Sequence, residues 1–463
     1  MTAPTDRADR ADRADRAASG KAARGRVPRS AHAAWVPPVD RGDPVALLER
    51  QGRDRLPELL PVRHARMAAS PLAFLRGAAA VMAADLAARP HTGLTVQLCG
   101  DAHLLNFGLH TSPEGTPLFD LNDFDETFPG PFEWDVKRLA VSVAVAGREN
   151  GHEDAAVHRA AAEAAAAYRR HMRRLARRGE LEVWYERVDA RSLLPLVRSV
   201  ARHGPEGSGS LNRARRHTGL RALRRLTEVV DGGLRIVHDP PLLEPAGMPD
   251  TASIRKIFSD YRSTLSGEHR LLLDRYRFVD AARKTVGVGS VGTRCFLVLL
   301  AGRDGRTGRK NADDLLFLQL KEARRAVLED HLNSGPYDHH GHRVVAGQRL
   351  LQAGRDVFLG WTSGPQGRPF YWRQLRDATV LPDVAGMRPG DLRAYARLCG
   401  AVLARAHARS GDRVAIAAYL GGADTFDRAV ADFALSYADQ TAADHAALGA
   451  AIAAGVVRAA PEP

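Results

Sequence analysis

Apolar residues recur at near-helical spacing between Pro71 and Ala88, which predicts a helix over this stretch. Ser70 directly precedes Pro71, and a serine followed by proline is a typical helix start. The pattern then changes to the alternation of a strand at 94–98, and a second short strand is predicted at 118–121. We therefore expect residues 99–110 to include a loop between two short strands.

Helical periodicity dominates from about 132 to 278, with a turn-rich loop expected at 239–249. After Ala282 the apolar runs become short and β-compatible, which predicts a small antiparallel sheet interrupted by one helix. The predicted strands are 295–300, 315–320, 357–361 and 370–375, and the predicted helices are 343–353, 391–409 and 425–453.

Residues 1–40 differ from the rest of the chain in composition. They contain an Asp-Arg-Ala repeat, followed by glycine, serine, arginine and proline. Such a segment has little apolar surface to bury against the entropy cost of ordering. We expect a disordered charged tail.

Composition narrows the possible classes of protein. The chain has 463 residues and 44% hydrophobic content, enough for a large core and two lobes. Three distant cysteines suggest neither disulfides nor a zinc cluster, and no apolar run approaches a membrane span, so a cytoplasmic protein is expected. The net charge is +13, but arginines alternate with acids along the whole chain, which argues against a nucleic-acid partner.

One loop carries residues suited to phosphate transfer, in the order Gly100-Asp101-Ala102-His103-Leu104-Leu105-Asn106. Asp101 can orient the attacking hydroxyl or accept its proton, and the Asn106 amide oxygen can bind Mg²⁺. Asp120 or Asp123, on the next strand, can bridge that metal to phosphates. For any one of these residues, an ordinary solvated turn is the alternative.

The motif Gly-Asp-x-His-x-x-Asn resembles the catalytic loop of aminoglycoside and choline phosphotransferases, which belong to the protein-kinase-like superfamily. Cys99 stands where these enzymes usually have a histidine that braces the backbone. The resemblance makes Asp101 and Asn106 the catalytic residues, with Asn106 also on the metal.

The segment 120–125 is similar to the metal-binding segment of the same superfamily, with Asp120, Asp123 and Asp125 as candidate ligands. Spacing favours Asp120, whereas the Asp-Phe-Asp order favours Asp123. The resemblance also gives Asp135 a structural role, as the cap of the following helix. Residues 60–455 further resemble a bacterial family known only as a domain of unknown function, number 2252, which implies no substrate.

A glycine loop, Gly287-x-Gly289-x-x-Gly292, precedes an apolar strand, as in kinases, where backbone amides approach phosphates. A hairpin that needs positive φ is the ordinary alternative. Lys321 closes the strand 315–320 in a chain with only six lysines, and it could reach the α- and β-phosphates. Glu322 or Glu329 could hold it, and Glu322 is assigned to the cofactor site.

The order of these motifs is reversed relative to kinases, so we expect a circularly permuted, two-lobed, kinase-like α+β fold. A helical lobe at 41–282 would carry the catalytic and metal loops, and a small β lobe at 283–376 the glycine loop and lysine. Residues 377–463 would add helices to the large lobe. The predicted activity is ATP- and Mg²⁺-dependent phosphate transfer to a small-molecule hydroxyl. Nucleotidyl (AMP) transfer and a non-catalytic nucleotide-binding module remain alternatives.

Overall fold

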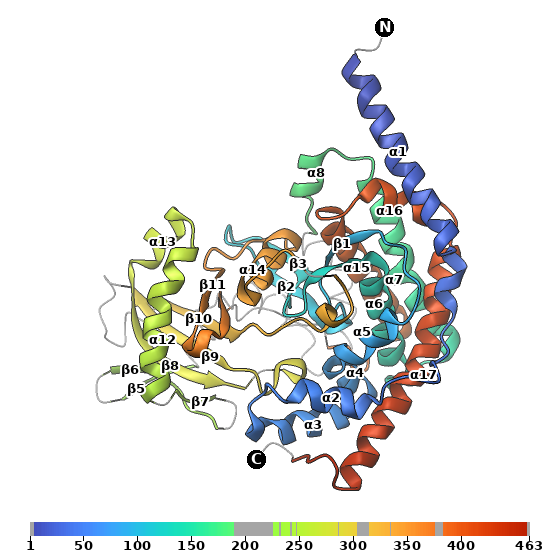
Figure 1. The fold of residues 1–463 in the computed structure, drawn as a ribbon. Coiled ribbons are helices and arrows are strands. Elements are labelled where there is room, and N and C mark those ends of the chain that lie inside the picture. Colours follow the sequence, from blue (N-terminus) through green and yellow to red (C-terminus); the bar gives the residue numbers. More distant parts are fainter. Residues whose placement is uncertain are drawn as a thin grey trace.

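The protein has a mixed α+β fold in which every sheet is antiparallel over the described residues (Figure 1). Helices form most of one side of the molecule, and the largest sheet lies on the other. The computed structural model describes residues 4–188, 226–230, 233–240, 243–246, 248–285, 287–302, 314–333, 335–375 and 383–460.

The expectation of a disordered N-terminal tail is wrong for most of residues 1–40, because α1 (Pro4–Arg26) is a long helix. Its second half packs against α16 (Arg413–Leu420), while its first turns extend beyond the body of the protein (Figure 1). Gly20 allows the close approach, since a Cβ there would lie 2.0 Å from the Ala415 carbonyl oxygen.

Arginines attach α1 to the body. Arg16 Nη2 lies 2.9 Å from Asp412 Oδ1, and Arg24 Nε donates to the Tyr419 carbonyl oxygen at 2.9 Å. Asp12 and Arg16 also form an i,i+4 ion pair along the helix. The end of the repeat, from Asp12 onwards, therefore belongs to a docked helix, a role that composition alone does not reveal.

A bundle of helices forms the main core. α15 lies along α7, and α17 packs on both α6 and α7. The buried residues between them include Leu139, Tyr168, Leu403 and Phe433. The bundle and its neighbours comprise α2 (Pro44–Gly52), α3 (Leu60–Ala68), α4 (Pro71–Gly77), α5 (Ala79–Ala87), α6 (Phe132–Glu149), α7 (Asp154–Leu175), α8 (Glu180–Tyr185), α15 (Pro389–Ala408), α16 and α17 (Thr425–Ala453).

The helix predicted after Pro71 starts as expected but is broken into α4 and α5. Ser70 caps α4, and its hydroxyl accepts from the Ala73 amide at 3.2 Å. Gly77 ends α4 because it packs on Met67, where a Cβ would lie 2.5 Å from the sulfur. This break turns the end of α4 toward the loop that follows β1.

Two small antiparallel pairs surround the predicted catalytic loop. β1 (Thr95–Leu98) pairs with β4 (Phe128–Pro131), and β2 (Phe107–Thr111) pairs with β3 (Pro117–Leu121). The strands predicted at 94–98 and 118–121 are confirmed as β1 and β3. The loop runs from β1 into β2, a strand that the sequence analysis missed.

A six-stranded sheet has the order β11-β12-β10-β9-β8-β7. The strands predicted at 295–300, 315–320 and 370–375 are confirmed, whereas the one predicted at 357–361 lies later, at 360–363. The sheet also begins earlier than expected, because residues expected to be loop or helix form β7 and β8. Residues 303–313, which connect β9 to β10, lie outside the described residues. The bounds are β7 (Leu243–Pro245), β8 (Tyr276–Lys284), β9 (Cys295–Gly302), β10 (Leu315–Glu322), β11 (Gly360–Ser363) and β12 (Pro369–Gln374).

Helices α12 (Met248–Tyr261) and α13 (Gly267–Leu273) cover one face of this sheet (Figure 1). Tyr261 stacks on Trp372 with ring centroids 4.8 Å apart. The helices confirm the middle of the segment predicted as helical, but β8 replaces its end. A separate hairpin, β5 (Thr227–Val230) with β6 (Gly233–Ile236), also lies where helix was expected.

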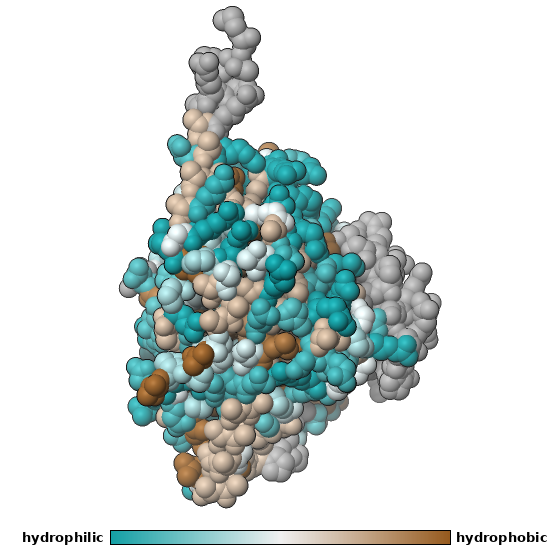
Figure 2. All heavy atoms as spheres, turned by 90° about the vertical axis from the view of Figure 1, so that its right-hand side faces the viewer, coloured by the Kyte–Doolittle hydropathy of each residue, from teal (hydrophilic) through white to brown (hydrophobic). Residues whose placement is uncertain are grey.

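Helix α14 (His340–Leu351) lies between β10 and β11 along the chain, close to the helix predicted at 343–353. It packs on β11 and β12. Over the described residues, no helix has the length and apolar character of a membrane span. Figure 2 shows the helical side of the molecule as mainly hydrophilic, with isolated apolar residues.

Candidate functional site

The loop after β1 is held in place by contacts of its own backbone, and a glycine in the loop allows one of them. Gly100 has φ of 87°, and a Cβ there would lie 2.0 Å from the Glu126 carbonyl oxygen. The Asp135 carboxylate accepts from the Cys99 amide at 2.7 Å and from the Gly100 amide at 3.1 Å. The loop is therefore held against the segment 123–126 and the start of α6.

Asp135 has a structural role, but not as the cap of α6, whose N-cap is Pro131. It lies in the first turn and receives a further contact from His407 Nε2 at 3.1 Å. His407 Nδ1 lies 2.9 Å from the Tyr168 hydroxyl, so a buried chain of polar groups supports the loop from behind. This chain braces the backbone at Cys99.

Asp101 is held by three neighbours. Arg138 Nη2 lies 2.7 Å from Asp101 Oδ1, and Asn106 Nδ2 donates to the Asp101 carbonyl oxygen at 2.6 Å. His103 Nε2 is 3.7 Å from Oδ2. Burial raises the pKa of Asp101, although Arg138 opposes the rise. Burial and Arg138 lower the pKa of His103, which keeps its ring neutral.

The three candidate metal aspartates have different surroundings. Asp120 on β3 has 0% exposure, forms an ion pair with Arg405 and accepts from the Ala353 amide at 2.7 Å. It does not line the pocket described below, whereas Asp123 does. Asp125 is the counter-ion of Lys321.

The glycine loop forms a short 3₁₀ turn at Val288–Ser290, held from outside by Arg55. Arg55 Nη1 donates to the Val291 carbonyl oxygen at 2.5 Å and Nη2 to that of Gly289 at 3.0 Å. Gly287 and Gly289 line the pocket. Gly292 has φ of 85° and packs on Arg55, so it shapes the turn without lining the pocket, and Val286 lies outside the described residues.

Lys321 projects from β10 toward the helical side and is 3% exposed. Burial alone would lower its pKa, but Asp123 and Asp125 raise it above its ordinary value, so the ammonium group stays charged. The Tyr371 hydroxyl also donates to Asp125, at 2.8 Å.

Glu322 follows Lys321 along β10 and projects to the opposite face, as alternation in a strand requires. It accepts from the Arg294 amide at 3.1 Å, and Arg368 Nη1 lies 3.5 Å away. Glu329 lies 3.4 Å from Arg343. Neither glutamate forms an ion pair with Lys321; Asp125 takes that place.

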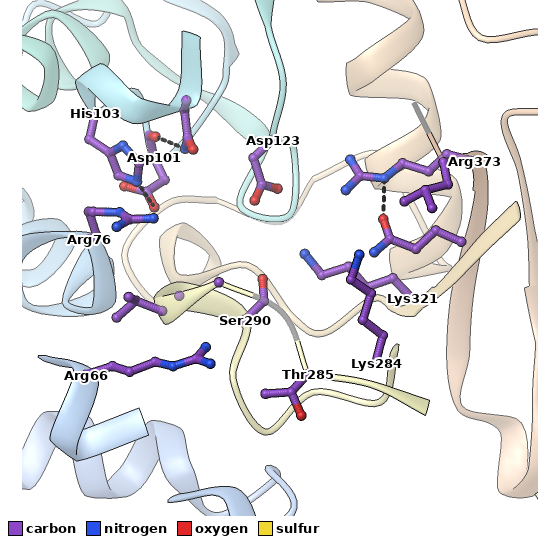
Figure 3. Close-up of a pocket in the computed structure, with 16 residues that line it drawn as sticks. Arg66, Arg76, Asp101, His103, Asp123, Lys284, Thr285, Ser290, Lys321 and Arg373 are labelled. Atoms are coloured by element: carbon purple, nitrogen blue, oxygen red, sulfur yellow. Dashed lines mark hydrogen bonds and ion pairs between the residues drawn. The ribbon is translucent and has the colours of Figure 1, made fainter. Parts of the chain in front are cut away.

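These segments meet in one pocket of about 490 Å³, a volume suited to a small-molecule site (Figure 3). The helical side contributes the loop after β1 and the ends of α3 and α4, and the sheet side contributes β8, β10, β12 and the glycine loop. The lining residues are Arg66, Arg76, Asp101, His103, Asn106, Asp123, Lys284, Thr285, Gly287, Val288, Gly289, Ser290, Gln319, Lys321, Arg373 and Leu375.

A family model described as an uncharacterised protein conserved in bacteria, DUF2252, matches residues 55–451. The chain belongs to this family. Comparisons with curated proteins and with solved structures found no match.

Several pocket residues of this DUF2252 protein were missed by the sequence analysis, and some had a signal. Gln319 and Lys321 alternate along β10, and Arg373 lies opposite Gln319 in the register of β12. Arg373 Nε donates to Gln319 Oε1 at 2.7 Å. Lys284 is another of the few lysines. Arg66 had no comparable signal in a chain so rich in arginine.

An Mg²⁺ ion in this pocket would have few protein ligands. Over the described residues, no group of three or more His, Cys, Asp or Glu side chains is placed to hold a metal. Mg²⁺, however, commonly binds one or two protein oxygens together with waters and substrate phosphates. Asn106 and Asp123 both line the pocket and supply oxygens of this type.

Proposed function

We propose that this DUF2252 protein is an ATP- and Mg²⁺-dependent phosphotransferase that acts on a hydroxyl group of a small molecule. The observation that carries the proposal is the single pocket shared by Asp101, Asn106, Asp123, Gly289 and Lys321. These residues come from segments far apart in the sequence. Their chemical types are those that phosphoryl transfer requires at one place.

Asp101 would orient the acceptor hydroxyl and accept its proton. Burial raises the pKa of its carboxyl group, and a base with a raised pKa takes a proton more readily. Arg138 and Asn106 fix the residue in place. The Asp101 side chain is therefore already held in one conformation when the acceptor hydroxyl binds.

The nucleotide would lie between the glycine loop and Lys321. Backbone amides of Gly287 and Gly289 suit the phosphates, and the charged Lys321 would bind the α- and β-phosphates. Asn106 and Asp123 would hold Mg²⁺, which supplies neutralisation of phosphate charge when bound. Asp125 keeps Lys321 in position.

The reversed order of the motifs supports a permuted relative of kinases as part of the same proposal. The six-stranded sheet follows the catalytic loop in sequence, yet its residues reach the same pocket. Permutation changes the order of segments without changing the groups that meet. A cytoplasmic location, where ATP is abundant, belongs to this proposal too.

The test compares the wild-type protein with Asp101→Asn, which keeps a hydrogen-bond acceptor for Arg138. We expect ATP with Mg²⁺ to raise the melting temperature of both proteins. Wild type should consume ATP in the presence of an acceptor, and the rate of the variant should be lower by a factor of at least about 10². Asp15→Asn, at an exposed position, is the control and should behave as wild type.

Product analysis separates the alternatives. ADP would support phosphoryl transfer, whereas pyrophosphate with an adenylylated product would indicate nucleotidyl transfer. Binding without consumption over a broad acceptor panel would indicate a non-catalytic module. Failure of the wild-type protein to bind nucleotide would contradict the proposal altogether.

A further inference from the structure

The positive charges of the pocket fall into two groups. Among the lining residues, five side chains are cationic and two are carboxylates, so the pocket has an excess of positive charge. Figure 3 shows Lys284, Lys321 and Arg373 on the sheet side, and Arg66 and Arg76 on the opposite side. Arg76 lies close to Asp101 and away from Lys321, and Arg66 lies on the same side of the pocket but further from Asp101.

Arg76 lies in the last turn of α4 and extends into the pocket. A Cβ on Gly287 would lie 3.9 Å from Arg76 Nη2, so the guanidinium reaches across to the glycine loop. Its Nε atom is buried without a hydrogen-bond partner. Over the described part of the chain, no carboxylate lies within ion-pair distance of Arg76.

Two other cations near the pocket are already paired with carboxylates of the protein. Arg138 pairs with Asp101, and Lys321 pairs with Asp125. Arg76 is different, because burial and the neighbouring Arg66 lower its pKa while only Asp101 opposes this. The Arg76 side chain is half-buried, and a buried N–H group without an acceptor, such as its Nε, is costly to maintain unless a ligand supplies one.

We propose that Arg76, with Arg66 beside it, binds an anionic group of the acceptor. The acceptor is then a hydroxyl compound that also carries a phosphate or carboxylate group. Guanidinium groups bind both anions through paired hydrogen bonds. The inference rests on the proposed function, since Asp101 marks the side of the pocket where the acceptor hydroxyl is used.

The first experiment measures binding of inorganic phosphate by calorimetry, with the pocket saturated by a non-hydrolysable ATP analogue and Mg²⁺. We expect wild type to bind phosphate under these conditions. Arg76→Met should weaken phosphate binding by about tenfold or more and leave analogue binding nearly unchanged. Lys284→Met should instead weaken binding of the analogue and leave phosphate binding nearly unchanged. Arg53→Met removes the same charge at an exposed position and should change neither.

The second experiment measures ATP consumption with matched acceptors: sugar phosphates against the free sugars, and hydroxy acids against their amides. The compounds with an anionic group should be preferred, and the pair with the larger preference identifies phosphate or carboxylate. In Arg76→Met, KM for the preferred acceptor should rise more than kcat falls.

Three outcomes would overturn the inference alone: phosphate displaced by the analogue, phosphate binding unaffected by Arg76→Met, or equal use of neutral and anionic acceptors. In each case nucleotide binding and consumption would remain, and the proposed function would stand. Absence of nucleotide binding in the wild-type protein would overturn both.

Discussion

Residues of the same chemical type have different roles in this protein because their neighbours differ. Asp120 and Asp123 are three positions apart, yet Asp120 is buried in an ion pair with Arg405, whereas Asp123 lines the pocket. Asp125, two positions further, is the counter-ion of Lys321. The spacing and the order of residues left the choice between Asp120 and Asp123 open, and the partner of each carboxylate distinguishes them.

The contrast between the two aspartates predicts two different phenotypes. Asp120→Asn should destabilise the protein by about 3 kcal/mol, because Arg405 would keep a buried charge without its counter-charge. Asp123→Asn should cost less stability than Asp120→Asn, because Lys321 keeps Asp125 as its ion-pair partner, and it should weaken the dependence of ATP consumption on Mg²⁺. Urea unfolding and Mg²⁺ titration of each variant measure these effects. A stable Asp120→Asn with altered Mg²⁺ dependence would contradict the assignment.

Gly100 predicts a steric effect at the catalytic loop. Gly100→Ala combines positive φ with a clash at the Glu126 carbonyl oxygen and should cost at least about 2 kcal/mol of unfolding free energy. Gly115→Ala is the matched control, since its φ is also positive but nothing lies within 4 Å. It should cost about 1 kcal/mol. Equal losses in urea unfolding would show that the clash is relieved by movement of the loop.

At the scale of elements, sequence pattern predicted what local spacing controls. Three strands of the main sheet and the start of α4 follow from alternation, apolar runs and the Ser70 cap. The break at Gly77 could not be predicted, because it depends on Met67 from another helix. The same holds for α1, whose order depends on carbonyl groups of α16 rather than on its own composition.

The candidate site was predicted to a similar extent. Glycine, aspartate, asparagine and lysine motifs have recognisable spacing, so residues of two distant segments were expected at one cleft. Arg76 and Arg373 were not expected, because arginine is common along the chain and their positions depend on packing. Glu322 was assigned to the cofactor site next to a lysine in sequence, but alternation of the strand places it on the other face.

The docking of α1 gives a prediction about one helix. Arg24→Ala removes donors from the carbonyl groups at the end of α16 and should destabilise the protein by about 1–2 kcal/mol. Lys21→Ala, exposed on the same helix, should have almost no effect. Chemical denaturation of both variants measures the difference. Equal stabilities would mean that the Arg24 hydrogen bonds contribute little and that Arg16 and the apolar contacts hold α1 in place.

At the scale of the whole molecule, the pocket lies where the helical part and the sheet meet. Arg55, in the segment between α2 and α3, donates hydrogen bonds to the glycine loop. The pair Lys321–Asp125 connects the sheet to the segment after β3. The contacts that join the two parts therefore also shape the pocket. Stability and ligand binding should be coupled at this junction.

The Lys321–Asp125 pair allows these two contributions to be separated. Lys321→Met leaves the half-buried Asp125 without its cation and should destabilise the protein by about 2 kcal/mol. Asp125→Asn should do the same to Lys321, whereas the double variant should recover much of the loss, because no unpaired charge remains. If Lys321 binds phosphates, the melting-temperature rise with ATP and Mg²⁺ should be lost in Lys321→Met and stay lost in the double variant. A double variant that regains both stability and the nucleotide response would show that the lysine only joins the two parts of the protein.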